Sequence, residues 1–134
     1  MFPLVATIPI DQRLIIREAV ASDASDVLLH LKTVGAETDF LSFAPRDIKR
    51  SLESQSELIT KSQAADNHLY IVAEINHQLV GGLHFRGQDR PRTRHSGTFG
   101  ITVLKDYWGL GIGHKLIEAL IKWAQHSGII RKIN

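Results

Sequence analysis

The apolar residues near the N-terminus are first clustered as in a β-strand and then spaced as in a helix. Residues 13–19 (RLIIREA) are rich in β-branched side chains and predict a first strand. Ser22 is a plausible N-cap of a following helix that ends at Gly35. The apolar stripe of this helix comprises Val27, Leu28, Leu31 and Val34.

A second helical region has a weaker pattern. Residues 36–43 predict a loop, after which Pro45 and Asp47 open the helical region. Its apolar residues over 48–62 are only loosely periodic, which is compatible with one helix or with two short ones.

The next segments predict three strands. Residues 69–75 (LYIVAEI) and 78–85 (QLVGGLHF) form a hairpin around Asn76–His77, with an irregularity at Gly81–Gly82. Residues 95–103 (HSGTFGITV) form the fourth strand of the chain. Its apolar residues alternate with small or hydroxyl residues and are Phe99, Ile101 and Val103.

The fourth strand leads through glycines at positions 109, 111 and 113 into a long helix that ends at Gly128. The apolar face of this helix comprises Leu116, Ile117, Leu120, Ile121 and Ala124. Residues 129–133 predict a fifth strand. The order β-α-α-β-β-β-α-β predicts a mixed α/β fold, in a single domain over residues 1–134 whose first 12 residues are an N-terminal extension.

Composition narrows the classes of protein. The chain has 134 residues, of which 43% are hydrophobic and 22% are charged, as in soluble globular domains. The net charge of +2 gives no basic face for nucleic acid. No signal peptide and no apolar run of roughly 20 residues is present, so we expect a cytoplasmic protein with no membrane partner. The 7 histidines show no ligand spacing and no cysteine occurs, so no metal site is expected.

The glycine turn is the main candidate for chemistry. Glycine lets backbone N–H groups approach a ligand closely, and the start of a helix carries partial positive charge, so together they favour a phosphate group. A dinucleotide fingerprint would need the third glycine one residue later. A phosphate-binding loop of the Walker type would need Lys after Gly113, where the chain has His114.

The sequence resembles the GNAT superfamily of acetyl-CoA-dependent N-acetyltransferases. The family signature is Gln or Arg, two residues, Gly, one residue, and Gly or Ala, between the fourth strand and the next helix. WGLGIG at 108–113 fills this frame and matches at Gly111 and Gly113, with Trp108 in place of the polar residue. The resemblance implies a mostly antiparallel sheet flanked by helices, and transfer of acetyl from acetyl-CoA to a primary amine of a small molecule or protein.

The resemblance also implies a set of binding residues. Backbone groups of Ile101 and Val103, with Thr102 between them, would pair with the pantetheine arm of acetyl-CoA. The N–H donor for the oxyanion would come from the strand near Ile101. The backbone around Gly111, Ile112, Gly113 and His114 would cradle the pyrophosphate. The preceding turn residues Trp108, Gly109 and Leu110 complete the predicted cofactor-binding set.

The base that takes the proton of the amine is left open. Many family members place a glutamate on the fourth strand, whereas this strand offers Thr98. The alternatives are His84, His95, an acid such as Glu37 or Asp39, or ordered water. Each histidine taken singly is more often a packing or surface residue than a base.

The C-terminal end also departs from the family. Members continue with a helix and two strands beyond the fifth strand, whereas this chain stops at Asn134. We therefore expect a truncated form, whose last strand is an exposed edge capable of pairing in a homodimer. Two alternatives to an active enzyme stay open: a non-catalytic module that binds CoA, and an interaction domain that keeps the turn for packing.

Overall fold

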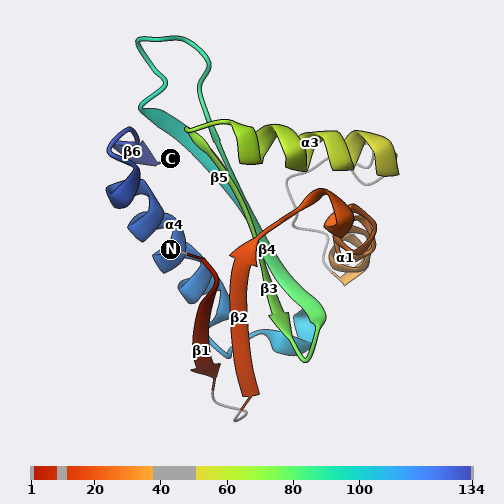
Figure 1. The fold of residues 1–134 in the computed structure, drawn as a ribbon. Helices are drawn as coiled ribbons and strands as arrows, with labels where there is room; N and C mark the ends of the chain where they lie inside the picture. Colours follow the sequence, from red (N-terminus) through yellow and green to blue (C-terminus); the bar gives the residue numbers. More distant parts are fainter. Residues whose placement is uncertain (1, 9–11, 38–50, 134) are drawn as a thin grey trace.

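A curved six-stranded sheet forms the centre of the molecule, with helices on both faces (Figure 1). The computed structural model describes residues 2–8, 12–37 and 51–133. The strands lie in chain order and are β1 (Leu4–Ile8), β2 (Gln12–Glu18), β3 (His68–Ile75), β4 (Gln78–Gly87), β5 (Ser96–Val103) and β6 (Lys132–Ile133). Neighbouring strands are antiparallel except β5 and β6, which are parallel. The predicted fold class is thereby confirmed.

The helices divide the buried residues into two clusters. The described elements are η1 (Ala21–Asp23), α1 (Ala24–Glu37), α3 (Leu52–Ala64), η2 (Lys105–Tyr107) and α4 (Ile112–Ser127). The larger cluster lies between the sheet and α4 and includes Phe85, Leu116 and Leu120. The smaller one lies on the opposite face, under α1 and α3, and includes Val27, Ile59 and Val72. None of the described helices combines the length and apolar character needed to cross a membrane.

Strand β1 is an additional strand within residues 1–12, the segment that the sequence analysis described as an N-terminal extension. Leu4–Ile8 pairs antiparallel with β2, so that the sheet gains one edge strand. Pro3 directly precedes this strand. Proline is compatible with the ends of an edge strand, where one side of the backbone has no ladder partner.

The start and end of the first helix also differ from the prediction. Ser22 is not the N-cap, because it lies within the 3₁₀ turn η1 that precedes α1. The carboxylate of Asp23 instead accepts the N–H of Val20 at 2.8 Å. Helix α1 continues through Gly35 to Glu37. A glycine inside a helix costs only about 1 kcal/mol, which tertiary contacts readily offset.

The second helical region is one helix over its described part. Helix α3 begins after Ser51, whose hydroxyl accepts the N–H of Ser54 at 3.1 Å as an N-cap. The remainder of the predicted loop and of the predicted helix start, including Pro45 and Asp47, lies outside the described residues.

The predicted β3–β4 hairpin is confirmed, and its irregularity lies one residue before the predicted place. Asn76 and His77 both have positive φ, 51° and 66°, as a tight two-residue turn requires. Opposite β3, the register skips Val80, which is fully buried. This bulge turns Val80 toward the α4 side, while Leu79 packs on the α1 side.

The last predicted strand is shorter than expected. Only Lys132–Ile133 of the predicted 129–133 segment forms β6, and it pairs with Ser96 and Gly97 at the start of β5. Ile130 precedes β6 and is buried in the core cluster that also contains residues of α4. Ile121, which we predicted on the apolar face of α4, is 45% exposed.

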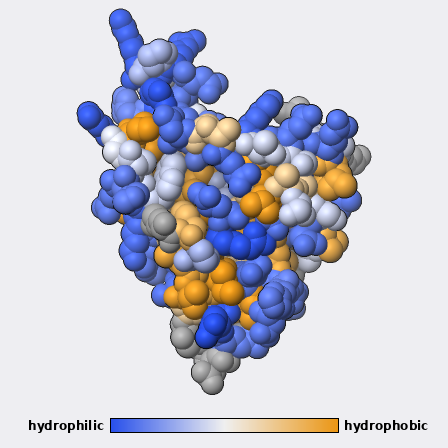
Figure 2. Space-filling view, viewed as in Figure 1, coloured by the Kyte–Doolittle hydropathy of each residue, from blue (hydrophilic) through white to orange (hydrophobic). Residues whose placement is uncertain are grey.

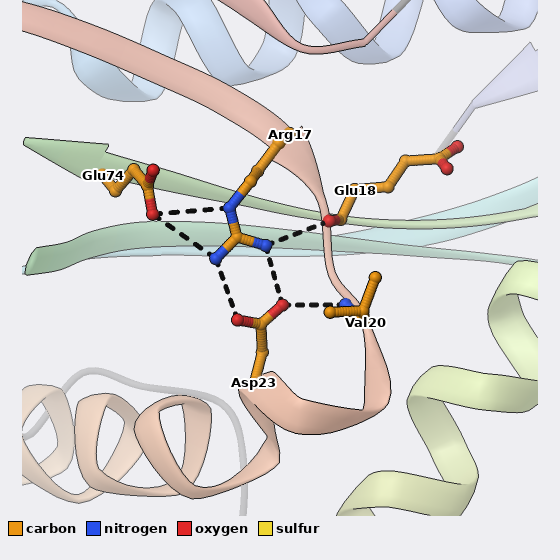
Figure 3. A network of polar contacts seen from close by, with 5 residues as sticks. All are labelled: Arg17, Glu18, Val20, Asp23 and Glu74. Atoms are coloured by element: carbon orange, nitrogen blue, oxygen red, sulfur yellow. Dashed lines mark hydrogen bonds and ion pairs between the residues drawn. The ribbon is translucent and has the colours of Figure 1, made fainter. Parts of the chain in front are cut away.

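A polar network joins the 3₁₀ turn η1, which leads into α1, to strands β2 and β3 (Figure 3). The guanidinium of Arg17 on β2 makes two hydrogen bonds of 2.8 Å to the carboxylate of Asp23 and reaches Glu74 on β3 at 3.3 Å. The side chains of Asp23 and Glu74 are 10% and 16% exposed, so water screens this network weakly. The Arg17 guanidinium holds the pKa of Asp23 below its ordinary value.

We expect Arg17→Met to lower the free energy of unfolding by about 2 kcal/mol at pH 7, because it removes the cationic partner of two mostly buried carboxylates. The folded-state pKa of Asp23 is depressed, so its contribution is present above its ordinary pKa of 3.8 and is lost as the pH falls through the lower folded value. Asp23→Asn should therefore flatten the acid side of the stability curve, measured by urea denaturation between pH 2 and pH 7.

A matched control is Arg94→Met. Arg94 forms an ion pair with Asp66, but these side chains are 44% and 61% exposed. This variant should stay within about 0.5 kcal/mol of wild type. Equal losses for the two arginines would contradict a special role for the Arg17 network.

Candidate active site

A cleft opens where the end of β5, the start of α4 and helix α1 meet. Its volume is about 500 Å³. It is lined by Val34, Ile101, Thr102, Val103, Tyr107, Trp108, Gly109, Gly111, Ile112, Gly113 and Ile117. Strand β5 and the glycine turn, which the sequence analysis identified as candidate binding segments, therefore line the same cleft.

Most of the predicted binding residues meet in this cleft. Eight of the ten line it, and the exceptions are Leu110 and His114. Leu110 is half-buried against the core cluster, and the exposed His114 ring pairs with Glu118 at 2.6 Å. The sequence analysis gave no binding role to Val34, Tyr107 or Ile117. Their positions in the cleft wall depend on how α1 and α4 pack on the sheet.

Gly111 gives α4 an open N-terminus. It is the N-cap residue and has φ 83°, in the left-handed region that L side chains rarely adopt. A Cβ built on it would meet nothing within 4 Å, so the space beside this turn is free for a ligand. No side chain caps α4, and its first turn contains no acidic residue. The partial positive charge at this end of the helix is thus directed at the cleft without a side-chain counter-charge.

The cleft side of β5 presents backbone groups without a strand partner. Leu104 donates its N–H to Val80 at 2.9 Å, which places Val103 at a position whose own N–H and C=O face away from β4. The alternation of an antiparallel ladder gives Ile101 the same orientation. Within the described residues, β6 covers β5 only at Ser96 and Gly97, so the edge is open at Ile101 and Val103.

Trp108 has a role that its position in the glycine motif did not reveal. Its indole N–H donates to the C=O of Val103 at 2.8 Å. The side chain therefore ties the glycine turn back to the end of β5 and occupies one acceptor on the open edge. Trp108 as a whole is 54% exposed.

The three weak candidates for catalysis lie outside the cleft lining. The ring of His84 stacks on Tyr70, and its Nε2 lies 3.1 Å from the hydroxyl of Ser62 on α3. His95 is exposed and is the last residue of the turn that precedes β5. The connection between β4 and β5 forms the top of the molecule in the view of Figure 1, where Figure 2 shows mostly hydrophilic residues. Thr98 is exposed on β5, paired with Arg86 rather than beside the glycine turn. Asp39 and the side chain of Glu37 lie outside the described residues.

A buried histidine that the sequence did not single out lies beside the cleft. His30 on α1 is 5% exposed, and its Nε2 lies 2.8 Å from the hydroxyl oxygen of Thr102. Burial lowers the pKa of His30 to about 4, so its imidazole is neutral at neutral pH. A signal was available, because His30 lies three residues after Val27 and four before Val34, within the apolar stripe of this helix.

The side chains around the cleft carry no formal charge at neutral pH. The residues described as lining it include neither carboxylates nor basic side chains, and Tyr107 is their single ionisable group. In the described part of the chain, no three side chains of the metal-binding types are close enough to hold a metal ion. Backbone groups therefore dominate the recognition that this cleft can offer.

Comparisons with known proteins agree on one family. The model of the acetyltransferase (GNAT) family matches residues 37–134. No curated protein matches the chain significantly. Among solved structures, a GNAT-family acetyltransferase from Streptococcus pneumoniae has a TM-score of 0.85 and 36% identity, covering 90% of this chain and 71% of that one.

Two further structures share the fold at lower identity. A putative acetyltransferase from Salmonella typhimurium, solved with its cofactor acetyl-CoA, has a TM-score of 0.71 and 20% identity, with 86% of this chain and 65% of that one covered. Ribosomal-protein-alanine N-acetyltransferase from Brucella melitensis has a TM-score of 0.71 and 24% identity, with 85% and 68% covered.

Proposed function

The chain belongs to the GNAT family of acetyltransferases, and from this premise we propose that it transfers the acetyl group of acetyl-CoA to a primary amine of a small molecule or a protein. The observation that carries the proposal is the cleft in which the open edge of β5 meets the glycine-capped start of α4. The Salmonella protein with acetyl-CoA and the Brucella protein that acts on a ribosomal-protein alanine support the choice of donor and of acceptor class.

In this proposal, the pantetheine arm lies along β5 as an added strand. The outward-facing backbone groups of Ile101 and Val103 are suited to pair with its amides, because no described strand competes for them. The Val103 C=O already accepts a hydrogen bond from the indole of Trp108, so Val103 would contribute chiefly its N–H. Val34 and Ile117 provide apolar walls for the arm.

The pyrophosphate would be held at the N-terminus of α4. The N–H groups of Ile112, Gly113 and His114 lie in the first turn of the helix, where the backbone has no intrahelical acceptor for them. Gly109 and Gly111 have no Cβ, and the space that a Cβ would occupy at each of them is free. The exposed imidazole of His114 lies outside the cleft lining, so its contribution would come from the backbone.

The reaction itself needs two further functions from the chain. As the amine nitrogen attacks the thioester carbonyl, the carbonyl oxygen gains negative charge that a fixed N–H donor stabilises. The outward-facing N–H of Ile101 is suited to this role. The amine must also lose a proton, and an ordinary ammonium group has a pKa of about 10, so a path for that proton is required at neutral pH.

One observation favours a second candidate function, a non-catalytic module that binds CoA. The described lining of the cleft contains no carboxylate and no histidine that could serve directly as a base. Such a module would bind acetyl-CoA at the same backbone groups and would release no thiol when amines are added.

Both candidates are tested by two measurements on the same preparation. We expect acetyl-CoA to raise the melting temperature and a panel of amines, including peptides with a free N-terminal alanine, polyamines and lysine peptides, to cause release of free CoA thiol. Binding without thiol release from any amine would favour the non-catalytic module. Absence of a melting shift at millimolar acetyl-CoA would refute both.

A further inference from the structure

Basic residues gather at the end of the sheet where β4 leads into β5. Segments 86–95 and 131–132 contain six basic residues and one acidic residue, and we call these two segments the basic end. The backbone joins them, because the N–H groups of Arg131 and Lys132 both donate to the C=O of His95, at 2.7 and 3.1 Å. The net charge of the whole chain, +2, does not reveal this concentration of positive charge.

Most cations of the basic end have no acidic partner in the part of the chain that the structure describes. Arg94 is the exception and pairs with Asp66. No described carboxylate forms an ion pair with the other five basic residues, which are all exposed: Arg86, Arg90, Arg92, Arg131 and Lys132. Like charges held close together favour a ligand of the opposite charge, so the basic end is suited to carboxylates.

An open track of small side chains leads from the basic end to the cleft. Thr98 and Gly100 of β5 share a face with Thr102, because alternate residues of a strand point to the same side. The hydroxyl of Thr102 lies beside His30, so this is the α1 side of the sheet. Thr98 and Gly100 are both exposed, and a Cβ on Gly100 would meet nothing within 4 Å. Thr98 pairs with Arg86 on β4, so the track ends at a cation of the basic end.

The orientation proposed for acetyl-CoA directs its thioester toward this track. With the pyrophosphate at the start of α4, the pantetheine arm passes Val103 before it reaches Ile101. The thioester is at the far end of the arm and therefore lies at Ile101, whose N–H is the proposed oxyanion donor. Gly100 and Thr98 follow in the same direction along β5. Because the described cleft lining carries no formal charge, selection of an acceptor by charge requires residues such as those of the basic end.

We propose that the acceptor is a polypeptide with acidic residues three or four positions from the acetylated amine, and that Arg86 selects it. The proposal rests on the acetyltransferase function above and names its acceptor class. Thr98 lies three residues from Ile101, about 10 Å along a strand, and an extended acceptor covers this distance in the same number of residues. Carboxylates at that separation from the amine come within reach of Arg86. Arg86 is thus a specificity residue that binds the acceptor away from the reacting atoms.

The basic end suits an acidic peptide better than a nucleic acid. Its segments contain no Phe, Tyr or Trp on which a base could stack. The small side chains of the track leave room for an extended backbone to pass between the basic end and the cleft.

A matched pair of peptides tests the acceptor class. The two octapeptides have a free N-terminal alanine and differ only at positions 4 and 5, which are both Glu or both Gln. A second pair has a blocked N-terminus and a single lysine, with Glu or Gln three and four positions after it. In at least one pair, we expect the Glu form to have a KM about fivefold lower at low salt, since exposed ion pairs are individually weak. The difference should vanish in about 1 M sodium chloride, where the Debye length is about 3 Å.

Variants of full-length protein test the role of Arg86. Arg86→Gln should remove most of the preference for the Glu form by raising its KM, and Arg86→Lys, which keeps the charge, should retain the preference. Arg13→Gln is the matched control. Arg13 is also an exposed arginine on a strand, but it lies near the β3–β4 turn, at the other end of the sheet, because the nearby Ile15 pairs with Glu74. This variant should keep the full preference.

The outcomes separate this inference from the function on which it rests. If no amine releases thiol, the proposed function fails and the acceptor class fails with it. If polyamines react but no peptide does, or if the Glu and Gln forms react equally, the acceptor class alone fails. A preference that persists in Arg86→Gln would place the acidic residues elsewhere and overturn the role of Arg86. Binding of a single-stranded RNA that Arg86→Gln abolishes, without any preference between the peptides, would assign the basic end to nucleic acid and also overturn the proposal.

Discussion

Gly111→Val is expected to abolish the stabilisation of the protein by acetyl-CoA. For wild type, acetyl-CoA at a hundredfold excess over its dissociation constant should add about 2.7 kcal/mol to the free energy of unfolding. Gly111 has φ 83°, which a β-branched residue strongly disfavours. Valine would pull this residue out of the left-handed region, re-aim the N–H groups at the start of α4 and place a side chain in the free space beside the turn.

The same helix provides the control. Gly128 ends α4 with φ 72°, and a Cβ there also meets nothing within 4 Å, but the residue is at the opposite end of the helix from the cleft. Gly128→Val should cost a similar amount of stability, about 1–2 kcal/mol or somewhat more, while the shift with acetyl-CoA persists. Thermal unfolding of both variants with and without acetyl-CoA measures the difference. A full shift for Gly111→Val would place the acetyl-CoA site elsewhere.

The backbone part of the site was predictable because glycine spacing and strand alternation are local properties. Gly111 and Gly113 follow a strand and open a helix, and this order alone indicates a backbone site for phosphate. The resemblance assigned Ile101 and Val103 to the pairing with the pantetheine arm, and the observed ladder register gives their backbone groups the outward orientation that this pairing requires. The roles of these residues in binding acetyl-CoA stay predictions.

The side-chain part of the site could not be predicted because it depends on contacts between distant segments. The partner of His30 is 72 residues away in the sequence, and that of Trp108 is a backbone carbonyl whose orientation depends on register. The irregularity at Val80, one residue before the expected glycines, shows the same limit. The two glycines indicated roughly where β4 is irregular. Packing on both faces of the sheet determined that Val80 is the extra residue.

Among the substitutions that add a single methyl group, we expect Gly97→Ala to destabilise the fold most. A Cβ on Gly97 would lie 2.3 Å from the C=O oxygen of Arg86, 2.6 Å from Cζ of Phe85 and 2.8 Å from Cα of Gly87. Two of these neighbours are backbone atoms that cannot rotate away. The third belongs to a fully buried ring that packs edge-on against Trp123, so it also has little freedom to move.

The expected loss is about 3 kcal/mol or more, because the strands must separate or the Phe85 ring must leave its place. Gly100→Ala is the matched control on the same strand, where a Cβ would meet nothing within 4 Å. It should stay within about 0.5 kcal/mol of wild type or slightly stabilise the strand. Urea denaturation of the two variants gives the comparison, and similar midpoints would contradict the close packing at Gly97.

The position of Gly97 also connects this prediction with the cleft. Gly97 pairs with Gly87 on β4 and with Ile133 on β6, so it lies where β5 is covered on both sides. Toward Ile101 and Val103 the described structure leaves the β6 side of β5 open. A Gly97→Ala protein that still folds should therefore have a shifted β5 register and weaker binding of acetyl-CoA, whereas Gly100→Ala should bind it as wild type does. Unchanged binding in a folded Gly97→Ala protein would show that the closed end of β5 does not determine the geometry of its open end.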